Sequence, residues 1–391
     1  MMQFNFNNPT KLIFGKGKLN TLNEYEMPGK KAMVLISNGK STKENGYLDR
    51  TLEQLKMTGT DSVVFDKIME NPVKEVIMEG ASFAREHQCD FIVALGGGAV
   101  LDAATAISAM ATNDGDLWDY IVGGTGKGQP LVHNGLPVVT IATTSGTGSE
   151  INFWGVISNL KTNEKIGFGG HESLIPVLSI VDPELMTTVP SRYTAYQGFD
   201  ALFHNTEVMI SNGINILSET LALSAIKSIA KYLPIAIEDG HNVEAREHVA
   251  YGSTIAGMSM QLTSTTAKHS MEHAMSAYHP NLPHGAGLIM ISKEFYQYFI
   301  DHHACDQQFI KMAKAMGIEN ANKPQDFITA LIELQKACHV DDLKMSDYGF
   351  TTNEFYKLAV NARETMGGLF LANPCEMNDQ ECAGIFERSY R

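Results

Sequence analysis

The stretch Asp90–Met110, DFIVALGGGAVLDAATAISAM, contains the pattern that decides the fold. It begins with the apolar run DFIVAL, which is typical of a strand buried on both faces. Three glycines at 96–98 follow, and the alanine-rich segment Leu101–Met110 then has the composition of a buried helix. A buried strand, a glycine turn and a helix in this order predict one strand–helix unit of a parallel sheet.

The same alternation extends from this unit in both directions, between Lys31 and about Ile180. Further apolar runs and helical patterns occur in turn at residues 32–37, 47–57, 62–66, 73–87 and 137–143. Strands that are apolar on both faces and alternate with helices indicate a parallel sheet with helices on both faces.

The character of the sequence changes after residues 180–183, IVDP. From Arg192 onward β-branched runs are few and helical patterns dominate, at residues 199–211, 215–232, 243–262, 268–278, 308–316 and 325–337. We therefore predict an α/β domain over residues 1–185 and an all-α domain over residues 186–391. Ligands usually bind in clefts between domains of this kind.

Composition disfavours several classes of function. The 391 residues favour two domains, and a chain with 44% hydrophobic and 19% charged residues is typical of a globular protein. A formal net charge of −14 disfavours nucleic acid and anionic membranes as partners, because they would repel the chain. Five cysteines without a CxxC pair favour reduced thiols and a cytoplasmic location. Neither a signal-peptide pattern nor an apolar stretch of membrane-spanning length is expected.

Two loops of the predicted sheet have the composition of an anion-binding site. The glycines at 96–98 let backbone N–H groups approach an anion at a helix N-terminus, and Asp102 lies in the first turn of that helix. The second loop, TTSGTGSE at residues 143–150, offers five hydroxyls and two glycines. A tight turn and a polar loop are the alternatives, and the triple glycine lacks GxGxxG spacing. Together the two loops favour a dinucleotide across the carboxyl edge of the sheet.

Four of the thirteen histidines lie in the segment 268–287, KHSMEHAMSAYHPNLPHGAG. His269 and His273 are four residues apart and project from one face of a predicted helix. His284, between a proline and a glycine, is expected in a turn near that face. The spacing indicates a metal or proton-transfer site, and surface or satisfied core histidines are the alternative.

Short motifs in a fixed order run along most of the chain, namely FGKG at 14–17, NP at 71–72, GGG at 96–98 with Asp102, TTSGTGSE at 143–150, DPE at 182–184, GFDA at 198–201 with His204, and the histidine segment with PHG at 283–285. In order and spacing they resemble the iron-dependent (group III) alcohol dehydrogenases, particularly the butanol dehydrogenase and broad-range aldehyde reductase branch. The resemblance implies a nucleotide-binding α/β domain and a helical, metal-binding domain, with the metal in the cleft between them.

The resemblance implies that four residues bind one divalent metal, Fe²⁺ or Zn²⁺: Asp200, His204, His269 and His284. Asp200 and His204 are four residues apart on one helical face, and three imidazoles with one carboxylate suit either metal. His273 is implied to lie beside the nicotinamide as a proton relay. His279, in the loop before Pro283, is expected near the site without binding the metal.

The resemblance also implies a coenzyme site made of Gly39, Lys40, Ser41, Gly96, Gly97, Gly98, Asp102, Thr143, Thr144, Thr147, Ser149 and Lys165. In family members that use NAD, an acidic residue falls about where this chain has Gly39. Here Lys40 can pair with a 2′-phosphate and Ser41 can donate to it, so we expect NADP(H) to be preferred over NAD(H). An exposed lysine in an ordinary turn is the alternative.

We therefore predict a cytoplasmic aldehyde reductase or alcohol dehydrogenase that transfers a hydride between NADP(H) and a small alcohol or aldehyde, and by analogy a homodimer. The alternatives are an NAD-dependent polyol (glycerol-type) dehydrogenase, a dehydroquinate-synthase-like lyase, and a non-catalytic metal- or nucleotide-binding protein. The lyase needs a glutamate as first ligand and basic residues for a phosphate, whereas YQGFDALFHN, residues 196–205, contains Asp200 and neither lysine nor arginine. A non-catalytic protein would be expected to have a broken set of site residues, and the set is intact.

Overall fold

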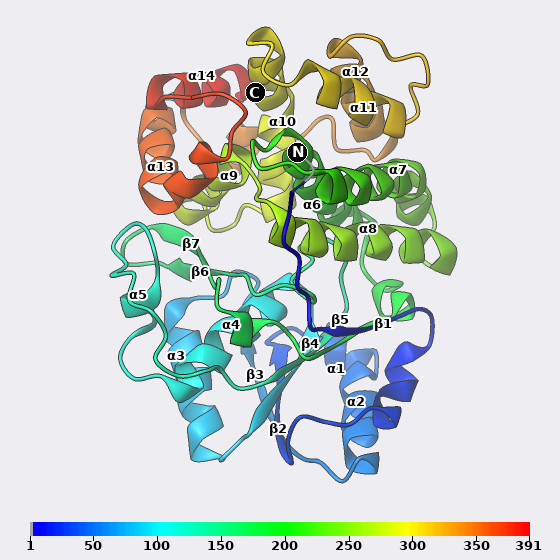
Figure 1. Ribbon diagram of the computed structural model, residues 1–391, viewed down its shortest axis with the longest axis vertical. Helices are drawn as coiled ribbons and strands as arrows, with labels where there is room; N and C mark the ends of the chain where they lie inside the picture. The colour runs from blue at the N-terminus through cyan, green and yellow to red at the C-terminus, as the bar shows by residue number, and fades with distance from the viewer. Residues whose placement is uncertain (1–2) are drawn as a thin grey trace. The chain divides into compact units, whose positions relative to one another are not determined.

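Six strands form a sheet in which every neighbouring pair is parallel, and this confirms the predicted α/β fold (Figure 1). The computed structural model describes residues 3–391. The strand order is β1 (Lys11–Phe14), β8 (Leu178–Val181), β5 (Val138–Ala142), β4 (Phe91–Gly96), β2 (Lys31–Ser37) and β3 (Asp61–Ile68). Every residue of β4 and β5 is buried, as expected for strands covered on both faces.

Helical segments cover both faces of the sheet. Val34 and Val93 belong to a hydrophobic cluster that also contains Leu22 of η1 (Lys18–Glu24) and Leu55 of α2 (Tyr47–Met57). The neighbours of these valines along each strand point to the opposite face of the sheet. Ile92, on that second face, is also fully buried. Helix α4 (Gly98–Thr112) packs on β4 and β5, and α3 (Lys74–Glu86) packs on α4. Shorter elements complete this part of the chain: α1 (Ser41–Glu44), α5 (Leu117–Tyr120), η2 (Glu172–Leu174), η3 (Pro183–Met186) and the two-stranded sheet of β6 (Gly155–Asn159) and β7 (Glu164–Phe168).

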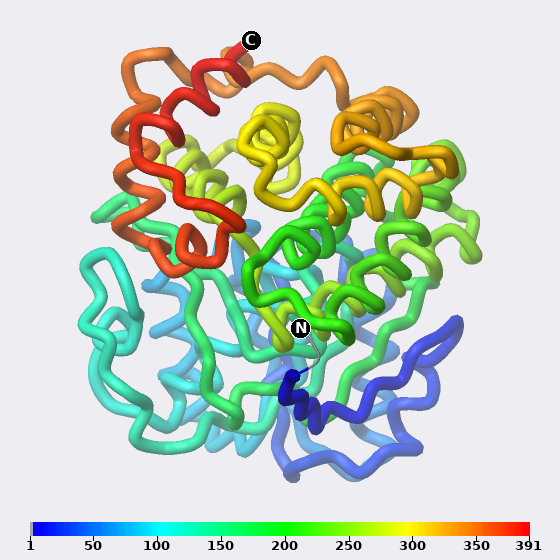
Figure 2. The backbone as a smooth tube through the Cα atoms, turned by 45° about the horizontal axis from the view of Figure 1, so that its top comes forward, coloured from blue at the N-terminus to red at the C-terminus, as the bar shows by residue number. Residues whose placement is uncertain are grey.

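From Ser191 onward the described chain is helical, which confirms the second part of the fold prediction (Figure 2). The helices are α6 (Ser191–Ile210), α7 (Ile216–Glu238), α8 (Val243–Leu262), α9 (Ala267–Tyr278), α10 (His284–Asp301), α11 (Asp306–Ala315), α12 (Gln325–Ala337), α13 (Phe355–Leu371) and α14 (Asp379–Ser389), with the short turns η4 (Met345–Tyr348) and η5 (Thr352–Glu354). Residues 198–210 of α6 are all buried, so α6 is the central helix of this region. It packs on α7, α8 and α10.

One element differs from the expectation at the site itself. His284 does not lie in a turn but is the first residue of α10, with Pro283 as the N-cap. Proline is tolerated at the start of a helix because the first N–H groups there have no helical acceptor. Gly285 is tolerated because α10 lies against the backbone of α6: a Cβ on Gly285 would be 2.2 Å from the carbonyl oxygen of Tyr196.

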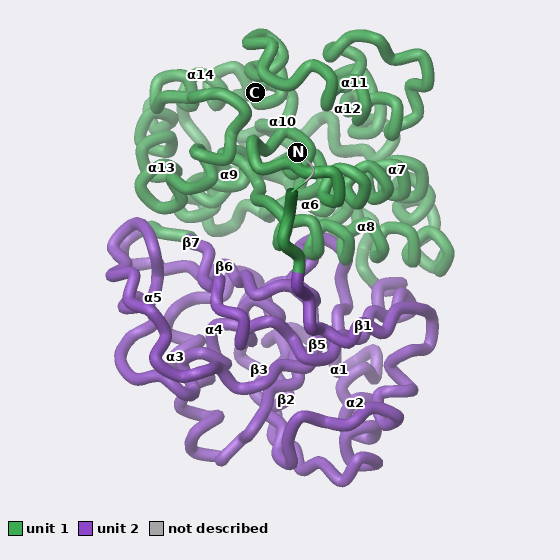
Figure 3. Tube along the Cα trace, in the orientation of Figure 1, with its two compact units in different colours: residues 1–6, 163–165, 189–391 green, residues 7–162, 166–188 purple. Residues whose placement is uncertain are grey.

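The chain divides into two compact units (Figure 3). Unit 2 comprises residues 7–162 and 166–188 and contains the six-stranded sheet. Unit 1 comprises residues 1–6, 163–165 and 189–391 and contains helices α6 to α14. Residues 163–165 therefore group with the helical unit although both of their chain neighbours belong to the other one.

Helix α7 qualifies the expectation that no segment is long enough to span a membrane. Of the described helices, α7 alone is long and apolar enough to cross a membrane, judged by length and composition only. Its residues Ala222, Ile226, Ile229 and Leu233 are fully buried in the core of unit 1. An apolar core helix passes the same test, so α7 is weak evidence for a membrane span.

Candidate metal and coenzyme sites

Three helices of unit 1 bring the four predicted metal ligands to one carboxylate oxygen. Helix α6 contributes Asp200 and His204 one turn apart, α9 contributes His269, and α10 begins with His284. The Oδ1 atom of Asp200 lies 3.4 Å from His204 Nδ1, 3.4 Å from His269 Nε2 and 3.5 Å from His284 Nε2. His269 and His284, which follow Asp200 by 69 and 84 positions in the chain, are thus brought to the same oxygen atom as His204.

The four residues are not equivalent in geometry. Asp200, His269 and His284 offer ligand atoms that all lie within 4.8 Å of one another. His204 is outside this group of three, and its ring stacks on that of His269 with the centroids 4.3 Å apart. Within the described chain, the buried Nδ1 of His204 has no hydrogen-bond partner. A buried nitrogen without a partner is costly, and a bound cation would satisfy it.

The charges around Asp200 suit a cation. Burial disfavours the Asp200 carboxylate, but His204, His269 and His284 outweigh burial and hold its pKa well below the usual range. Burial lowers the pKa of His204 to about 4, so its imidazole is neutral at pH 7 and keeps a lone pair. Burial opposes the charged form of His269 and His284, but Glu207 outweighs it and raises the pKa of His269, and Glu272 raises the pKa of His284 to about 9. These two imidazoles would therefore release a proton when a divalent metal binds, whereas His204 would not.

His273 faces the same region from the next turn of α9. It is 4% exposed, and its Nδ1 lies 2.8 Å from the thioether sulfur of Met366. Met366 has non-helical backbone angles inside α13, so the helix is kinked at the residue that contacts His273. Burial, followed by the nearby charge of Lys165, lowers the pKa of His273 well below its usual value. His273 is therefore neutral near pH 7 and able to accept a proton.

Two buried glutamates, which the sequence analysis did not identify, contact predicted ligands through the ring nitrogen that does not face Asp200. Glu207 accepts a hydrogen bond from His269 Nδ1 at 2.7 Å. Glu272 contacts His284 Nδ1 and Ser276 Oγ, and with His273 and His284 it forms a second group able to hold a metal. Each glutamate stands three residues after a predicted ligand, which places it on a neighbouring position of the same helix. That spacing is the signal that could have identified them.

Lys165 lies with the helical unit. Its ammonium is 3.6 Å from Glu272 Oε2, and its side chain is 7% exposed. Of the residues predicted to bind the coenzyme, Lys165 alone belongs to unit 1, and the others belong to unit 2.

The remaining predicted coenzyme residues follow three neighbouring strands. Residues 39–41 come after β2, Gly96 ends β4 and Gly97 and Gly98 follow it, and residues 143–149 come after β5. Because β5, β4 and β2 are adjacent and parallel, their carboxyl ends meet at one edge of the sheet. The structure thereby brings the three loops to the edge where dinucleotides bind in such sheets.

The glycine loop and the threonine loop are in direct contact. A Cβ on Gly97 would lie 2.9 Å from Thr144 Cγ2, and one on Gly98 would lie 2.4 Å from Thr147 Cγ2. Gly98 is already the first residue of α4, three residues before the predicted start of that helix. Glycine is required at these positions because the second loop occupies the space of a side chain.

Asp102 connects the two loops. It is 7% exposed, its Oδ1 accepts a hydrogen bond from Ser149 Oγ at 2.7 Å, and its Oδ2 accepts one from the Val156 N–H at 3.0 Å. The carboxylate thus fixes the end of the threonine loop and the start of β6.

The turn predicted to select the coenzyme is exposed. Asn38, Gly39, Lys40 and Ser41 are all exposed, and Lys40 is the N-cap of α1. A Cβ on Gly39 would lie 3.4 Å from Ser37 Oγ, so a side chain could be added there with little displacement.

His279 holds the segment after α12. Its Nδ1 lies 3.1 Å from the Tyr348 carbonyl oxygen and its Nε2 lies 3.0 Å from Glu354 Oε2. Its ring is 3.8 Å from that of Phe350. His279 therefore connects α9 to the η4–η5 segment and is not among the groups of potential metal ligands.

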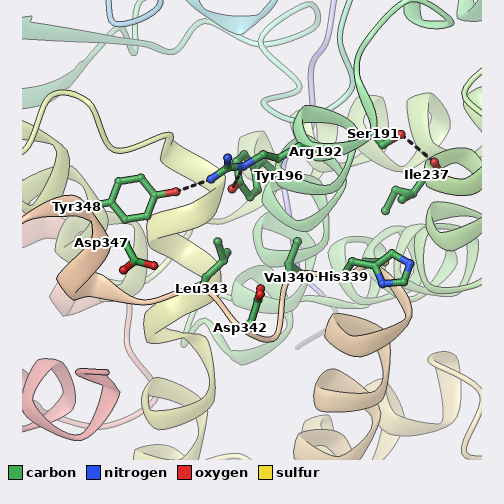
Figure 4. A pocket seen from close by; sticks show the side chains of 11 residues that line it. Ser191, Arg192, Tyr196, Ile237, His339, Val340, Asp342, Leu343, Asp347 and Tyr348 are labelled. Atoms are coloured by element: carbon green, nitrogen blue, oxygen red, sulfur yellow. Dashed lines mark hydrogen bonds between the residues drawn. The ribbon is translucent and has the colours of Figure 1, made fainter.

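A hollow of about 560 Å³ lies elsewhere in unit 1 (Figure 4). Arg192 crosses it and donates to the hydroxyls of Tyr196 at 2.6 Å and Tyr348 at 3.0 Å. Asp342 and Asp347 also line it, whereas none of the predicted metal or coenzyme residues in the described chain does. The hollow is therefore separate from the candidate site.

Comparison with known proteins matches nearly the whole chain. Residues 9–183 match the family model described as iron-containing alcohol dehydrogenase, and residues 194–390 match the model described as Fe-containing alcohol dehydrogenase family, C-terminal. A probable NADH-dependent butanol dehydrogenase 1 of Bacillus subtilis (strain 168) is 34% identical over 84% of both chains. A 1,3-propanediol dehydrogenase of Klebsiella pneumoniae is 30% identical over 99% of both.

Among solved structures, an archaeal halo-thermophilic alcohol dehydrogenase from a Red Sea brine pool is similar over 100% of this chain and 99% of its own, with a TM-score of 0.93 and 30% identity. The chain therefore belongs to the iron-containing alcohol dehydrogenase family. At the level of that family it is an NAD(P)-dependent alcohol dehydrogenase that acts on an alcohol or aldehyde.

Removing the carboxylate of Asp102 tests the connection between the two loops. In Asp102→Ala the buried Ser149 hydroxyl and the Val156 N–H lose their acceptor, so we expect the free energy of unfolding to fall by about 1–3 kcal/mol. Chemical denaturation measures the change. The exposed Asp114→Ala is the matched control, with an expected change within about 0.5 kcal/mol. Equal stability of both variants would contradict a structural role for Asp102.

Proposed function

We propose that the chain is a metal-dependent aldehyde reductase and alcohol dehydrogenase that prefers NADP(H) and acts on a small alcohol or aldehyde. The observation that carries the proposal is the convergence of three histidines on Asp200 Oδ1. Asp200, His204, His269 and His284 would hold Fe²⁺ or Zn²⁺, since one carboxylate and three imidazoles are a common donor set for both. When bound, the metal would act as a Lewis acid toward the substrate oxygen and the nicotinamide would supply the hydride.

His273 is the proposed proton relay. Its Nδ1 faces the sulfur of Met366, which leaves Nε2 as the position that takes a proton from an alcohol or returns one to the product. The imidazole is neutral at pH 7, but burial and Lys165 lower its pKa well below the usual value, so it is a weak base that would hold the proton only transiently. From His273 the proton would then exchange with solvent.

The coenzyme is assigned to the loops of unit 2. We propose that Gly96, Gly97 and Gly98 receive the pyrophosphate at the start of α4, with Thr143, Thr144 and Thr147 as donors from the facing loop. Ser149 would complete the coenzyme-binding loop without donating to the phosphate, because its hydroxyl donates to Asp102. Asp102 would act by fixing Ser149, and Lys165 is assigned to the nicotinamide end. On this assignment residues 1–185 form the dinucleotide-binding domain and residues 186–391 the metal-binding domain.

NADP(H) preference rests on the turn at residues 39–41. The segment from Ser37 to Lys43 contains no carboxylate that would repel a 2′-phosphate, and Lys40 and Ser41 are exposed donors. The Bacillus subtilis relative is named as NADH-dependent, so the proposal separates this chain from that enzyme. We also propose a cytoplasmic homodimer, and the five free cysteines are consistent with a reducing compartment.

An assay of the purified chain tests the reaction. After anaerobic purification and addition of Fe²⁺ or Zn²⁺, a short aliphatic aldehyde should cause oxidation of NADPH, measured by the loss of its absorbance. Oxidation of neither NADPH nor NADH would contradict the dehydrogenase itself. Faster use of NADH would contradict only the coenzyme preference.

Gly39→Asp should reverse the coenzyme preference. The new carboxylate would accept hydrogen bonds from the ribose hydroxyls of NAD(H) and repel the 2′-phosphate of NADP(H). The ratio of kcat/KM for NADPH to that for NADH should fall at least about tenfold, which corresponds to about 1.4 kcal/mol. Gly39→Asn is the uncharged control and should change the ratio much less. An unchanged ratio in Gly39→Asp would show that this turn does not meet the ribose.

The roles of the two α9 histidines can be separated. His269→Ala should lose bound metal, because it removes one of the three groups that converge on Asp200 Oδ1. His273→Ala should retain metal but lose rate by about 10²–10⁴-fold, the usual contribution of a positioned acid or base. Metal content after desalting and kcat measure the two effects. Loss of the ion from His273→Ala would favour the second group, Glu272, His273 and His284, as the metal site.

A further inference from the structure

The carboxylate of Glu207 is fully buried behind His269 and is completely satisfied by protein donors. Its Oε2 accepts hydrogen bonds from the Thr266 N–H and the Thr266 hydroxyl, both at 2.9 Å. Its Oε1 accepts from His269 Nδ1 at 2.7 Å and lies 3.3 Å from Lys268 Nζ. Four donors on one carboxylate fix its position, so Glu207 is a rigid support for the ring of His269.

Lys268 is equally buried, with 0% exposure of its side chain. Its ammonium donates to Tyr296 Oη at 3.0 Å and lies 3.1 Å from the centroid of the Phe203 ring. The Tyr296 hydroxyl also bonds to Thr206 Oγ1 at 2.6 Å, which completes the network.

Stability alone does not explain this pair. A buried ion pair loses the hydration of both charges, and apolar side chains of similar volume often stabilise a protein as well or better. Glu207 contacts the predicted ligand His269 and lies one helical turn after His204. Lys268 is the residue before His269. The position of the pair therefore points to an action on the site.

We propose that Glu207 is a positioning residue for His269, and that Lys268 balances the charge of Glu207. By accepting from Nδ1–H, Glu207 fixes the tautomer in which Nε2 carries the lone pair and faces Asp200, at 3.4 Å. Lys268 pairs with Glu207, so that the carboxylate offered to the ion is that of Asp200. The inference rests on the proposed metal site and assigns two residues that are not themselves ligands.

His284 and Glu272 have the same arrangement as His269 and Glu207. His284 presents Nε2 to Asp200 at 3.5 Å and Nδ1 to Glu272, and Lys165 lies 3.6 Å from that glutamate. Two ligands from different helices are thus each supported by a buried glutamate that has its own lysine. His204 differs, since its Nδ1 has no hydrogen-bond partner within the described chain.

Metal affinity of the whole chain tests the inference. The dissociation constants of Zn²⁺ and Co²⁺ are measured by competition with a chelator, and the visible spectrum of bound Co²⁺ reports the ligand geometry. Glu207→Gln keeps the size of the side chain but removes the charged acceptor, so affinity should fall about 10–100-fold and the Co²⁺ spectrum should change. Lys268→Met removes a positive charge near the ion, so affinity should be unchanged or higher while the thermal midpoint of the metal-free chain falls.

Arg246→Met is the control for loss of stability. Arg246 is 3% exposed and donates to Thr194, Val189 and Gly240, away from the ligands. Its variant should unfold at a lower temperature with unchanged metal affinity. The double variant Glu207→Gln/Lys268→Met keeps the test valid if a single change prevents folding, and it should also bind metal less tightly than the wild type.

The outcomes separate the inference from the proposed function. A wild-type chain that binds neither ion would overturn both. A wild type that binds metal, with a Glu207→Gln variant of equal affinity and identical Co²⁺ spectrum, would overturn the positioning role alone. Equal weakening in Glu207→Gln, Lys268→Met and Arg246→Met would also overturn it, because a general loss of stability would then explain the effect.

Discussion

The buried carboxylate of Asp200 is the interaction on which the helical unit depends. A charge removed from water needs partners, and here three imidazoles from α6, α9 and α10 surround one oxygen. The close approach of these helices excludes side chains at specific positions. A Cβ on Gly285 would be 2.2 Å from the Tyr196 carbonyl oxygen, and one on Gly287 would be 2.8 Å from Glu272 Cγ. Glycine at positions 285 and 287 therefore allows α10 to pack closely on α6 and α9 beside His284.

On the proposed function, the two units would contribute different parts of the chemistry. In unit 2, loops after β2, β4 and β5 present backbone N–H groups and hydroxyls at one edge of a parallel sheet, which suits a dinucleotide. In unit 1, side chains rather than backbone groups form the site, and they suit a divalent cation. Both sites depend on rigid supports that do not face the ligand: Asp102 holds Ser149, and Glu207 holds His269.

Sequence patterns predicted the buried strand β4 and the long helix α8. They missed β1, β8 and the β6–β7 pair, which are only four or five residues long, and also the helices α10, α13 and α14. They also placed His284 in a turn, because proline and glycine usually interrupt helices. Glu207, Glu272 and Lys268 were missed for another reason: a charged residue in a helix is normally solvated, so the spacing of the two glutamates from His204 and His269 places them near the ligands but does not show that they are buried.

Anomalous diffraction from a crystal of the Fe²⁺-loaded chain tests the central claim most directly, because it locates the ion without reference to activity. The account predicts one anomalous peak within bonding distance of Asp200, His204, His269 and His284, with Glu207 and Glu272 outside that distance. A peak among Glu272, His273 and His284 would contradict the account, since that second group excludes Asp200. A fully loaded crystal without a peak at either position would contradict it as well.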